Sequence, residues 1–412
     1  MKVTILTLGC KVNQAESAFI ATSLSSRGAT VVELSDQPDY CVINTCAVTA
    51  KSDYQSRQLI RRAVRTGAKV IVTGCYSEVS PEQIRRITGV FDVVPIVSKY
   101  NIINMIDSTI SSCSLHCTGR SRPYVKVQDG CNNACTYCIV PKARGKSRST
   151  DIPAILKQIS GFESRGYQEI VLTGVHLGAF GRDLNPAVRL ADLLRSILNV
   201  TGISRIRLSS LEVNEVDDEL IELLEEPRIC RHIHIPLQSG DDSILRLMRR
   251  SYAVKDFIST IERISRRVKN IAIGTDVIVG FPGEGEPEFS HSRRTIELLP
   301  LAYMHIFPFS PRPMTMASLM SRQIAVPIKK ERFSVLNALN IKKKEGYMSS
   351  QIGKILDIVI EERCSNGTVL GTSSNYLKVR TTSDGQRKGS LIYVRVSGID
   401  DGVLTGDAIH KP

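Results

Sequence analysis

The chain has 412 residues, of which 42% are hydrophobic and 23% are charged. This composition excludes a disordered chain, and no apolar run approaches the roughly 18 residues that a membrane span requires. The 54 Lys and Arg residues outnumber the 41 Asp and Glu residues and give a net charge of +13, which favours a polyanionic partner such as nucleic acid.

The first ten residues carry one lysine and a short apolar stretch that Thr4 and Thr7 interrupt. We interpret them as a β-strand and not as a secretory signal, which needs a longer apolar segment. The chain has 11 cysteines, and an odd number without an export signal does not fit a disulfide framework. We therefore expect a cytoplasmic protein with no membrane association, whose clustered cysteines bind metal or carry out redox chemistry.

Residues 1–118 alternate strand and helix signals, which predicts a Rossmann-like α/β domain with a mostly parallel sheet. The expected strands are Val3–Leu8, Tyr40–Ile43, Lys69–Thr73 and Phe91–Val97, and the expected helices are Gln14–Ser26, Lys51–Arg65 and Pro81–Thr88.

A cysteine follows each of the first three predicted strands, at Cys10, Cys46 and Cys75. Because the C-terminal ends of parallel strands meet at one edge of the sheet, we expect these cysteines to converge there on a common ligand. Gly9 and Gly74 would let the backbone approach a bulky group. The alternative is three unrelated buried cysteines.

The remaining cysteines outside the barrel loop receive a structural interpretation. Cys41 lies inside a predicted strand, Cys230 precedes one, and Cys364 occupies a predicted turn. Cys113 and Cys117 lie in a polar linker, where they could also pair as ligands.

Residues 119–345 carry six further strand–helix repeats, which predicts a full or partial (βα)6-type TIM barrel with its working face at the C-terminal ends of the strands. The expected strands are Tyr124–Gln128, Glu169–Thr173, Arg205–Leu208, Arg231–Ile235, Ile271–Ile278 and Ala302–Phe307. Residues 346–412 then change to short strands with Gly, Asn and Asp turns, which predicts a small all-β barrel.

Three cysteines with C-x3-C-x2-C spacing, Cys131, Cys135 and Cys138, directly follow the first barrel strand. Three thiolates on one loop can hold three irons of a [4Fe–4S] cluster and leave the fourth iron open to another ligand. A zinc site is the alternative, but it would want a fourth N or S ligand, and the sequence offers none nearby.

This spacing after a first barrel strand resembles the radical S-adenosylmethionine superfamily. In that family the open iron chelates S-adenosylmethionine, so the resemblance implies cofactor contacts at the ends of the following strands. The expected contacts are Gly174, Ser209, Glu212, Gln238 and Gly280. Tyr137 is expected to pack over the cluster.

Two incomplete cysteine sets in one chain resemble the methylthiotransferases over the whole length: an N-terminal cluster domain, a radical barrel and a C-terminal TRAM-like module that grips RNA. LGCKVNQ at residues 8–14, the stretch 173–181 and IPLQSG at residues 235–240 resemble the branch that acts on N6-threonylcarbamoyladenosine at position 37 of tRNA. That branch often carries Asn where this chain has His176.

The resemblance implies a second [4Fe–4S] cluster on Cys10, Cys46 and Cys75, whose added sulfur is methylated by one S-adenosylmethionine. A second S-adenosylmethionine at the barrel cluster would give the radical that takes hydrogen from adenosine C2, and the methylthio group would then move to that carbon. The implied partners are tRNA, a reductant protein and a sulfur source, and we expect a monomer.

Phosphate contacts to an unstacked anticodon loop need Lys and Arg. The candidates are Arg144, Lys146, Arg148, Arg246, Arg249, Arg250 and Lys342–Lys344. Three other functions stay open at this point: methylthiolation of N6-isopentenyladenosine or of a ribosomal-protein aspartate, a non-catalytic iron–sulfur RNA-binding sensor, and a zinc-binding RNA protein.

Overall fold

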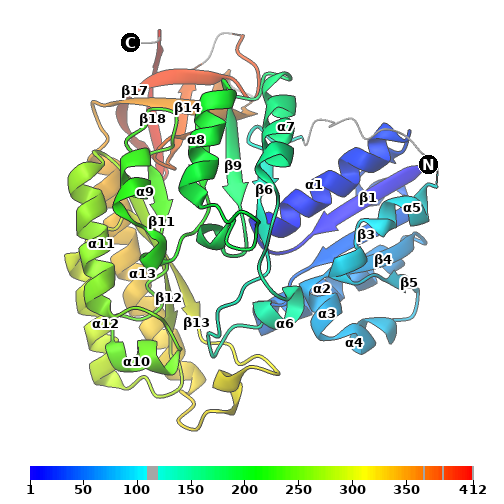
Figure 1. Ribbon diagram of the computed structural model, residues 1–412, viewed down its shortest axis with the longest axis horizontal. Coiled ribbons are helices and arrows are strands. Elements are labelled where there is room, and N and C mark those ends of the chain that lie inside the picture. The colour runs from blue at the N-terminus through cyan, green and yellow to red at the C-terminus, as the bar shows by residue number, and fades with distance from the viewer. Residues whose placement is uncertain (109–118, 365–366, 383–384, 411–412) are drawn as a thin grey trace.

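The computed structural model describes residues 1–108, 119–364, 367–382 and 385–410. Cys113 and Cys117 therefore lie outside the described residues, and the proposed pairing of these two cysteines is not addressed. Three units follow one another along the chain (Figure 1): an N-terminal α/β unit, a larger α/β unit in the centre and a small β-barrel at the C-terminus.

The N-terminal unit is a five-stranded parallel sheet with strand order β2-β1-β3-β4-β5, as the strand–helix alternation predicts. Alternate side chains of β3 face opposite sides of the sheet: Cys41 and Ile43 join one apolar cluster, and Val42 joins the other. Helices cover both faces (Figure 1), so the sheet buries both of its faces. The elements are β1 (Lys2–Thr7), α1 (Lys11–Ser26), β2 (Thr30–Val31), β3 (Tyr40–Thr45), α2 (Ala50–Val64), β4 (Lys69–Gly74), α3 (Cys75–Val79), α4 (Pro81–Arg85), β5 (Val90–Val93) and α5 (Asn101–Ile106).

The central unit has six parallel strands in two three-stranded sheets, with orders β10-β9-β6 and β11-β12-β13. This is the predicted mixed α/β architecture, a partial barrel whose two outer strands, β6 and β13, are not paired with each other. Its elements are β6 (Tyr124–Lys126), β7 (Gln128–Asp129), α6 (Val140–Arg144), β8 (Arg148–Ser149), α7 (Ile152–Glu163), β9 (Glu169–Thr173), α8 (Leu190–Val200), β10 (Arg205–Leu208), α9 (Asp218–Leu223), β11 (His232–His234), α10 (Asp242–Leu247), α11 (Val254–Arg267), β12 (Ala272–Val279), α12 (Glu286–Leu298), β13 (Tyr303–Pro308) and α13 (Val326–Ser349).

The period-2 alternation of the barrel strands separates an apolar outer face from a polar inner face. Outward side chains such as Ile170, Ile206 and Ile233 pack with the helices in one large core. The intervening residues face the barrel interior and include charged side chains such as Glu169 and Arg207, both fully buried. These two charges are paired with each other, which makes their burial possible.

The C-terminal unit is a closed five-stranded barrel with order β14-β15-β16-β18-β17, as the short-strand pattern predicts. It covers the N-terminal ends of the central strands. Arg205 of β10 donates to the Asp357 and Thr372 carbonyl oxygens, and Arg207 donates to those of Ser373 and Ser374. The strands are β14 (Ile355–Arg363), β15 (Thr368–Ser373), β16 (Lys378–Thr382), β17 (Leu391–Asp400) and β18 (Val403–Ile409).

Several elements differ from the sequence expectation, among them the unpredicted two-residue strand β2. The strand predicted at Phe91–Val97 ends at Val93, because Pro95 has no N–H to donate to the ladder and a 3-10 turn follows it at Ile96–Ser98. Strand β18 was not predicted, although it pairs with both β16 and β17. In the described part of the chain, none of the helices has both the length and the apolar character needed to cross a membrane.

Candidate active site

The barrel cysteines lie on one loop between β7 and α6, at the C-terminal end of the barrel strands. Gly130 begins this loop with φ +73°, and a Cβ there would lie 2.0 Å from the Lys146 carbonyl oxygen, so the turn requires glycine. Thr136 ties the loop down: its hydroxyl donates to the Leu247 carbonyl oxygen at 2.8 Å and its N–H to that of Met248 at 3.1 Å. The loop is thus fixed on both sides before any ligand binds.

Each of two barrel thiols has a polar neighbour. Arg250 Nη1 lies 3.3 Å from Cys135 Sγ, and His176 Nδ1 lies 3.7 Å from Cys131 Sγ. Burial raises the pKa of Cys138 to about 12, and burial also raises the pKa of Cys135, an effect that Arg250 partly offsets. Because the thiolate is the metal ligand, a bound metal must displace these protons, and the Arg250 guanidinium stabilises the charge that results.

The N-terminal cysteines follow β1, β3 and β4, at one edge of the parallel sheet. A Cβ added to Gly9 would lie 2.9 Å from Cys46 Cβ, so the turn that carries Cys10 packs directly on Cys46. Cys75 begins α3 directly after β4, which is paired with β3, and burial raises the pKa of its thiol to about 11. The three thiols therefore gather at one edge, as expected from strand ends in a parallel sheet.

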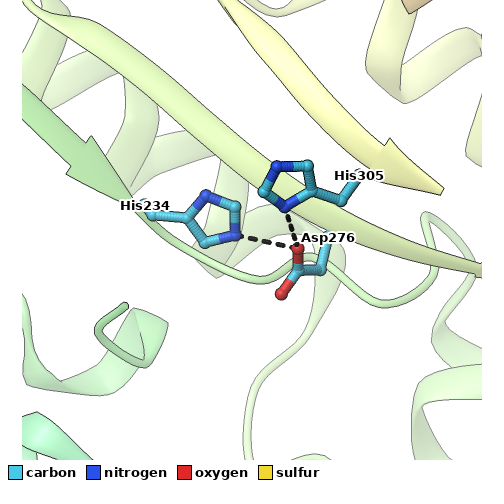
Figure 2. A group of neighbouring side chains, drawn as sticks. All are labelled: His234, Asp276 and His305. Atoms are coloured by element: carbon cyan, nitrogen blue, oxygen red, sulfur yellow. Dashed lines mark hydrogen bonds and ion pairs between the residues drawn. The ribbon is translucent and has the colours of Figure 1, made fainter. Parts of the chain in front are cut away.

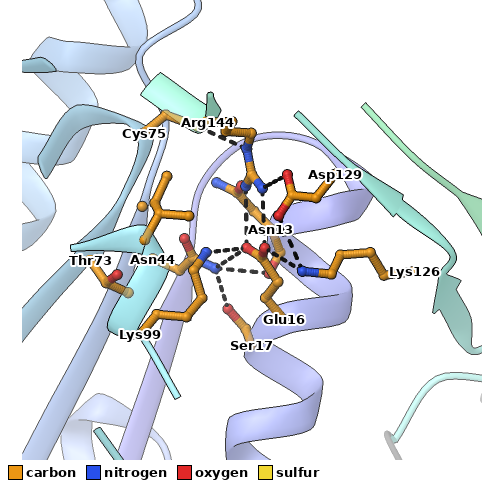
Figure 3. Close-up of polar contacts among 12 residues, drawn as sticks. Asn13, Glu16, Ser17, Asn44, Thr73, Cys75, Lys99, Lys126, Asp129 and Arg144 are labelled. Carbon is orange, nitrogen blue, oxygen red and sulfur yellow. Dashed lines mark hydrogen bonds and ion pairs between the residues drawn. The ribbon is translucent and has the colours of Figure 1, made fainter. Parts of the chain in front are cut away.

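Arg144 of the central unit reaches the N-terminal unit, where it contacts Cys75 (Figure 3). It ends α6, six residues after Cys138, and its Nε lies 3.4 Å from Cys75 Sγ. The same guanidinium donates to Asp129 at 2.7 Å and to Glu16 at 3.1 and 3.2 Å, and it contacts Asn13 Oδ1. One side chain thereby connects the barrel loop, the Cys75 thiol and helix α1.

Glu16 is the anion at the centre of this network and is fully buried. Lys99 lies 2.5 Å from it and Lys126 lies 3.0 Å from it, in addition to Arg144. Burial raises the pKa of Glu16, but the three cations outweigh burial and hold the pKa well below its ordinary range. Glu16 is therefore ionised at neutral pH and holds the two α/β units together.

Polar residues expected to contact the cofactor stand at the ends of β9 to β12, the same end as the cysteine loop. The hydroxyls of Thr173 and Ser209 are buried there and have no hydrogen-bond partner among the residues that the structure describes. Buried hydroxyls without partners are costly, so both are available to a polar ligand such as S-adenosylmethionine. Gly174 and Gly280 occupy crowded turns, where a Cβ would lie 2.8 Å from Gln128 Oε1 and 2.4 Å from Lys329 Cγ.

Four predicted residues have contacts that the sequence did not indicate. Glu212, expected at the cofactor, forms an ion pair with Arg250. Arg250 and Arg144, expected as RNA contacts, are buried in the ion pairs described above and are not accessible to a phosphate. Gln238 is half-buried with φ +65°, and its backbone bridges β12 through Asp276 and Ile278.

Two residues of the site were not found from the sequence. Glu16 lies on α1 and pairs with cations more than 80 residues away, and no local pattern reports such a pairing. His176 forms an ion pair with Glu215 at 2.7 Å beside Cys131. Burial lowers the pKa of His176, but its contacts with Cys131 and Glu215 outweigh this and raise it to about 10.

Comparison with known proteins identifies a family for part of the N-terminal unit and for part of the central unit. The family model described as the radical SAM superfamily matches residues 125–296, and the model described as uncharacterized protein family UPF0004 matches residues 2–95. Threonylcarbamoyladenosine tRNA methylthiotransferase MtaB of Aquifex aeolicus is 38% identical over 386 residues, which cover 88% of this chain and 93% of that protein.

A second relative, tRNA-2-methylthio-N(6)-dimethylallyladenosine synthase of Fervidobacterium nodosum, is 28% identical over 99% of both chains. Among solved structures, the radical S-adenosylmethionine methyltransferase TsrM of Kitasatospora setae, with cobalamin and a [4Fe–4S] cluster bound, superposes with a TM-score of 0.58 over 77% of each chain. At 15% identity this likeness concerns the fold alone.

Proposed function

The chain belongs to the radical S-adenosylmethionine family of tRNA methylthiotransferases, in the branch named for threonylcarbamoyladenosine, and from this we propose that it inserts a methylthio group at C2 of N6-threonylcarbamoyladenosine 37. The protein is accordingly a sulfur-group transferase that uses an iron–sulfur cluster and S-adenosylmethionine on a tRNA substrate. The relatives named for this base are more similar in sequence than the relative named for dimethylallyladenosine.

The observation that carries the proposal is the pair of cysteine trios, one at the strand ends of the N-terminal sheet and one on the barrel loop, with Arg144 of α6 beside Cys75. In our proposal Cys131, Cys135 and Cys138 hold one [4Fe–4S] cluster, and Cys10, Cys46 and Cys75 hold a second one. Each trio offers three thiols to four irons, so that each cluster would retain an open iron. When bound, these groups supply the one-electron chemistry that removes hydrogen from an unactivated C–H bond and the sulfur that replaces it.

The chain's own residues would fix and tune these groups. Arg250 beside Cys135 and Arg144 beside Cys75 place positive charge next to thiolates and favour the deprotonated, ligating form. Thr173 and Ser209 offer buried hydroxyls to S-adenosylmethionine. Gly174, Gln238 and Gly280 are proposed to line the same cofactor through their backbone. Glu212 would act indirectly, by holding Arg250.

Exposed cations around the site support RNA binding. Lys146, Arg148, Arg246, Arg249, Lys342 and Lys344 are exposed, whereas Lys343 is bound to the carbonyl oxygens of Glu297 and Leu299. We propose that the exposed members contact phosphates of an anticodon loop, that a reductant protein and a sulfur source act with the enzyme in the cytoplasm, and that it works as a monomer. We also propose functional units at residues 1–118, 119–345 and 346–412.

The direct test is mass spectrometry of tRNA nucleosides after expression in a host that lacks its own enzyme. We expect 2-methylthio-N6-threonylcarbamoyladenosine to appear and its unmodified precursor to fall. Appearance of 2-methylthio-N6-isopentenyladenosine, or of a modified ribosomal aspartate, would instead assign one of the alternative substrates.

Serine variants test the two-cluster proposal on the reconstituted enzyme. We expect Cys131→Ser to lose both 5′-deoxyadenosine release and methylthiolation. We expect Cys46→Ser to keep 5′-deoxyadenosine release and to lose methylthiolation. If Cys46→Ser still methylthiolates tRNA, the N-terminal trio is not the sulfur site.

A further inference from the structure

Three polar side chains on adjacent strands form a group in the barrel interior that the proposed cluster and cofactor contacts do not use (Figure 2). His234 is on β11, Asp276 on β12 and His305 on β13, and Asp276 is in register with His305. His234 Nε2 lies 2.9 Å from Asp276 Oδ1, and His305 Nδ1 lies 3.1 Å from the same oxygen. The side chain of His234 is 7% exposed, that of Asp276 23% and that of His305 55%.

The hydrogen bonds of this group converge on Asp276. His232 Nε2 lies 2.8 Å from the Tyr303 hydroxyl, which lies 3.1 Å from His234 Nδ1. An ionised Asp276 only accepts, so both of its histidine partners donate to it. His234 then accepts from Tyr303, and Tyr303 accepts from His232. The chain of donors fixes the His305 ring through Nδ1 and leaves Nε2 without a hydrogen-bond partner among the described residues.

The exposed ring of His305 lines a cavity of about 420 Å³. The cavity lies where β13, α13 and the C-terminal barrel meet, and Arg122, which precedes β6, also lines it. It therefore lies at the unpaired side of the partial barrel, between β13 and β6. Its cationic lining residues are Arg122, Lys344 and Lys378.

Only one of these cations is unpaired in the described structure. Arg122 and Lys378 both bind Glu361. Lys344 has no acidic partner among the described residues and is exposed. The cavity thus combines one free cation with the free ring nitrogen of His305.

Phe307 completes this side of the barrel. It lies two residues after His305 on the same face of β13, because side chains alternate along a strand. The intervening Ile306 instead packs against the outer core. Phe307 is 42% exposed, and its ring centroid lies 6.4 Å from that of His305. Along β13, starting from its C-terminal end, which is nearer the cysteine loop, the inner face therefore presents the Phe307 ring and then the His305 imidazole. Lys344 lies beside this imidazole in the lining of the cavity.

Building on the proposed function, we propose that this cavity receives the N6-threonylcarbamoyl arm of the substrate base, with His305 and Lys344 as specificity-determining residues. The arm has a urea, a hydroxyl and a carboxylate, which match a fixed imidazole and a free ammonium. A dimethylallyl arm has no hydrogen-bonding group and would leave these polar groups desolvated and unpaired. Phe307 would stack against the base while the arm extends toward His305.

The test compares two anticodon stem-loop RNAs that differ only at position 37, one with N6-threonylcarbamoyladenosine and one with adenosine. Binding of each RNA to the reconstituted holoenzyme is measured for the wild type, His305→Ala, His305→Gln and Lys344→Gln. Two controls remove comparable groups elsewhere: His291→Ala breaks an exposed pair with Asp241, and Lys330→Gln removes an exposed charge from α13.

The wild type is expected to prefer the threonylcarbamoyl RNA. His305→Ala and Lys344→Gln are each expected to reduce this preference by about tenfold while binding the adenosine RNA as before. His305→Gln is expected to retain part of the preference, because its amide can replace Nε2. Both controls are expected to match the wild type.

Equal losses of affinity for both RNAs would mean that these residues contact the part that the RNAs share or act only in folding. Either result would overturn the proposal. An unchanged preference in the variants would also overturn the proposal. So would one equivalent of zinc that is present in the purified wild type and absent from His305→Ala, because the metal ion would then occupy His234, Asp276 and His305. If the wild type modifies the threonylcarbamoyl base but the variants keep their preference, only this inference fails. If the wild type does not modify that base, the proposed function fails as well.

Discussion

Arg144 is the residue whose loss reaches furthest, because one guanidinium contacts both cysteine-bearing regions. Replacing it by methionine would leave Glu16 and Asp129 with fewer cations in a buried site. Removing one partner of a buried ion pair costs about 3–5 kcal/mol. We expect Arg144→Met to lower the free energy of unfolding by about that amount, measured by denaturant titration. Lys146→Met, an exposed change two residues later, is expected to have little effect; equal losses in both variants would contradict this role.

Removing the hydroxyl of Ser209 or Thr173 is expected to keep or raise stability, whereas removing the Arg144 guanidinium is expected to lower it. Their hydroxyls are buried without partners, so Ser209→Ala and Thr173→Val remove a polar group that costs free energy in the ligand-free chain. We expect thermal stability to be kept or raised, while the affinity for S-adenosylmethionine falls about tenfold in calorimetry. Ser334→Ala, on the exposed side of α13, is the control. Unchanged affinity in both variants would remove these hydroxyls from the cofactor site.

The sequence predicted the location of a residue well where its position along one strand decides that location. Cys10, Cys46 and Cys75 follow strands of a parallel sheet, and the topology gathers such residues at one edge. The sequence did not reveal burial that depends on a partner distant in the chain: Arg144 and Arg250 look like any other basic residues near a binding site. Only the approach of α1 and of Glu212 converts them into buried ion-pair partners.

At the scale of elements, Glu169 at the start of β9 holds the central strands to the C-terminal barrel. It is fully buried and bound by Arg205 and Arg207, with Arg122 at 3.4 Å. Burial raises the pKa of Glu169, but the three arginines outweigh burial and lower it to about 2. Because the folded pKa lies below the ordinary 4.5, the stabilisation is complete above about pH 4.5 and is lost as the pH falls toward 2.

Glu169→Gln tests this pH dependence. We expect it to lower the free energy of unfolding by about 3–5 kcal/mol at pH 7, and the difference from the wild type to shrink below about pH 4.5. Denaturant titrations at pH 7, 5 and 3 measure it. Glu262→Gln, in an exposed pair with Arg266, should change stability by less than about 0.5 kcal/mol. A difference that stays constant across these pH values would be inconsistent with this account.

Among the elements, the strands with a clear alternation were predicted and β18 was not. The sequence did contain the signal for β18: Asp401 and Gly402 have φ +47° and +69° between β17 and β18, as expected for a tight hairpin of the Asp-Gly kind. The two-residue strand β2 has no such signal, because it is too short for any period to be read.

For the whole molecule, the net charge of +13 predicts salt-dependent tRNA binding. We expect the logarithm of the affinity to fall linearly with the logarithm of salt concentration. Lys342→Gln is expected to reduce the slope of this line by about one. It is also expected to lower the affinity for the threonylcarbamoyl RNA and for the adenosine RNA equally. Filter binding between 50 and 200 mM salt, about the range over which such losses are seen, measures both quantities. An affinity that does not respond to salt would argue against phosphate contacts.

The C-terminal barrel also closes one end of the central unit. Tyr376 places its ring 4.4 Å from that of His232, and the Arg207 guanidinium lies 5.2 Å from the Tyr376 ring. A chain shortened before β14 would consequently expose the buried Arg205, Arg207 and His232 to water. The strands that carry His305 and its neighbours would then lose the barrel that packs against their N-terminal ends. The small terminal module therefore keeps these charged and aromatic side chains of the central unit away from water.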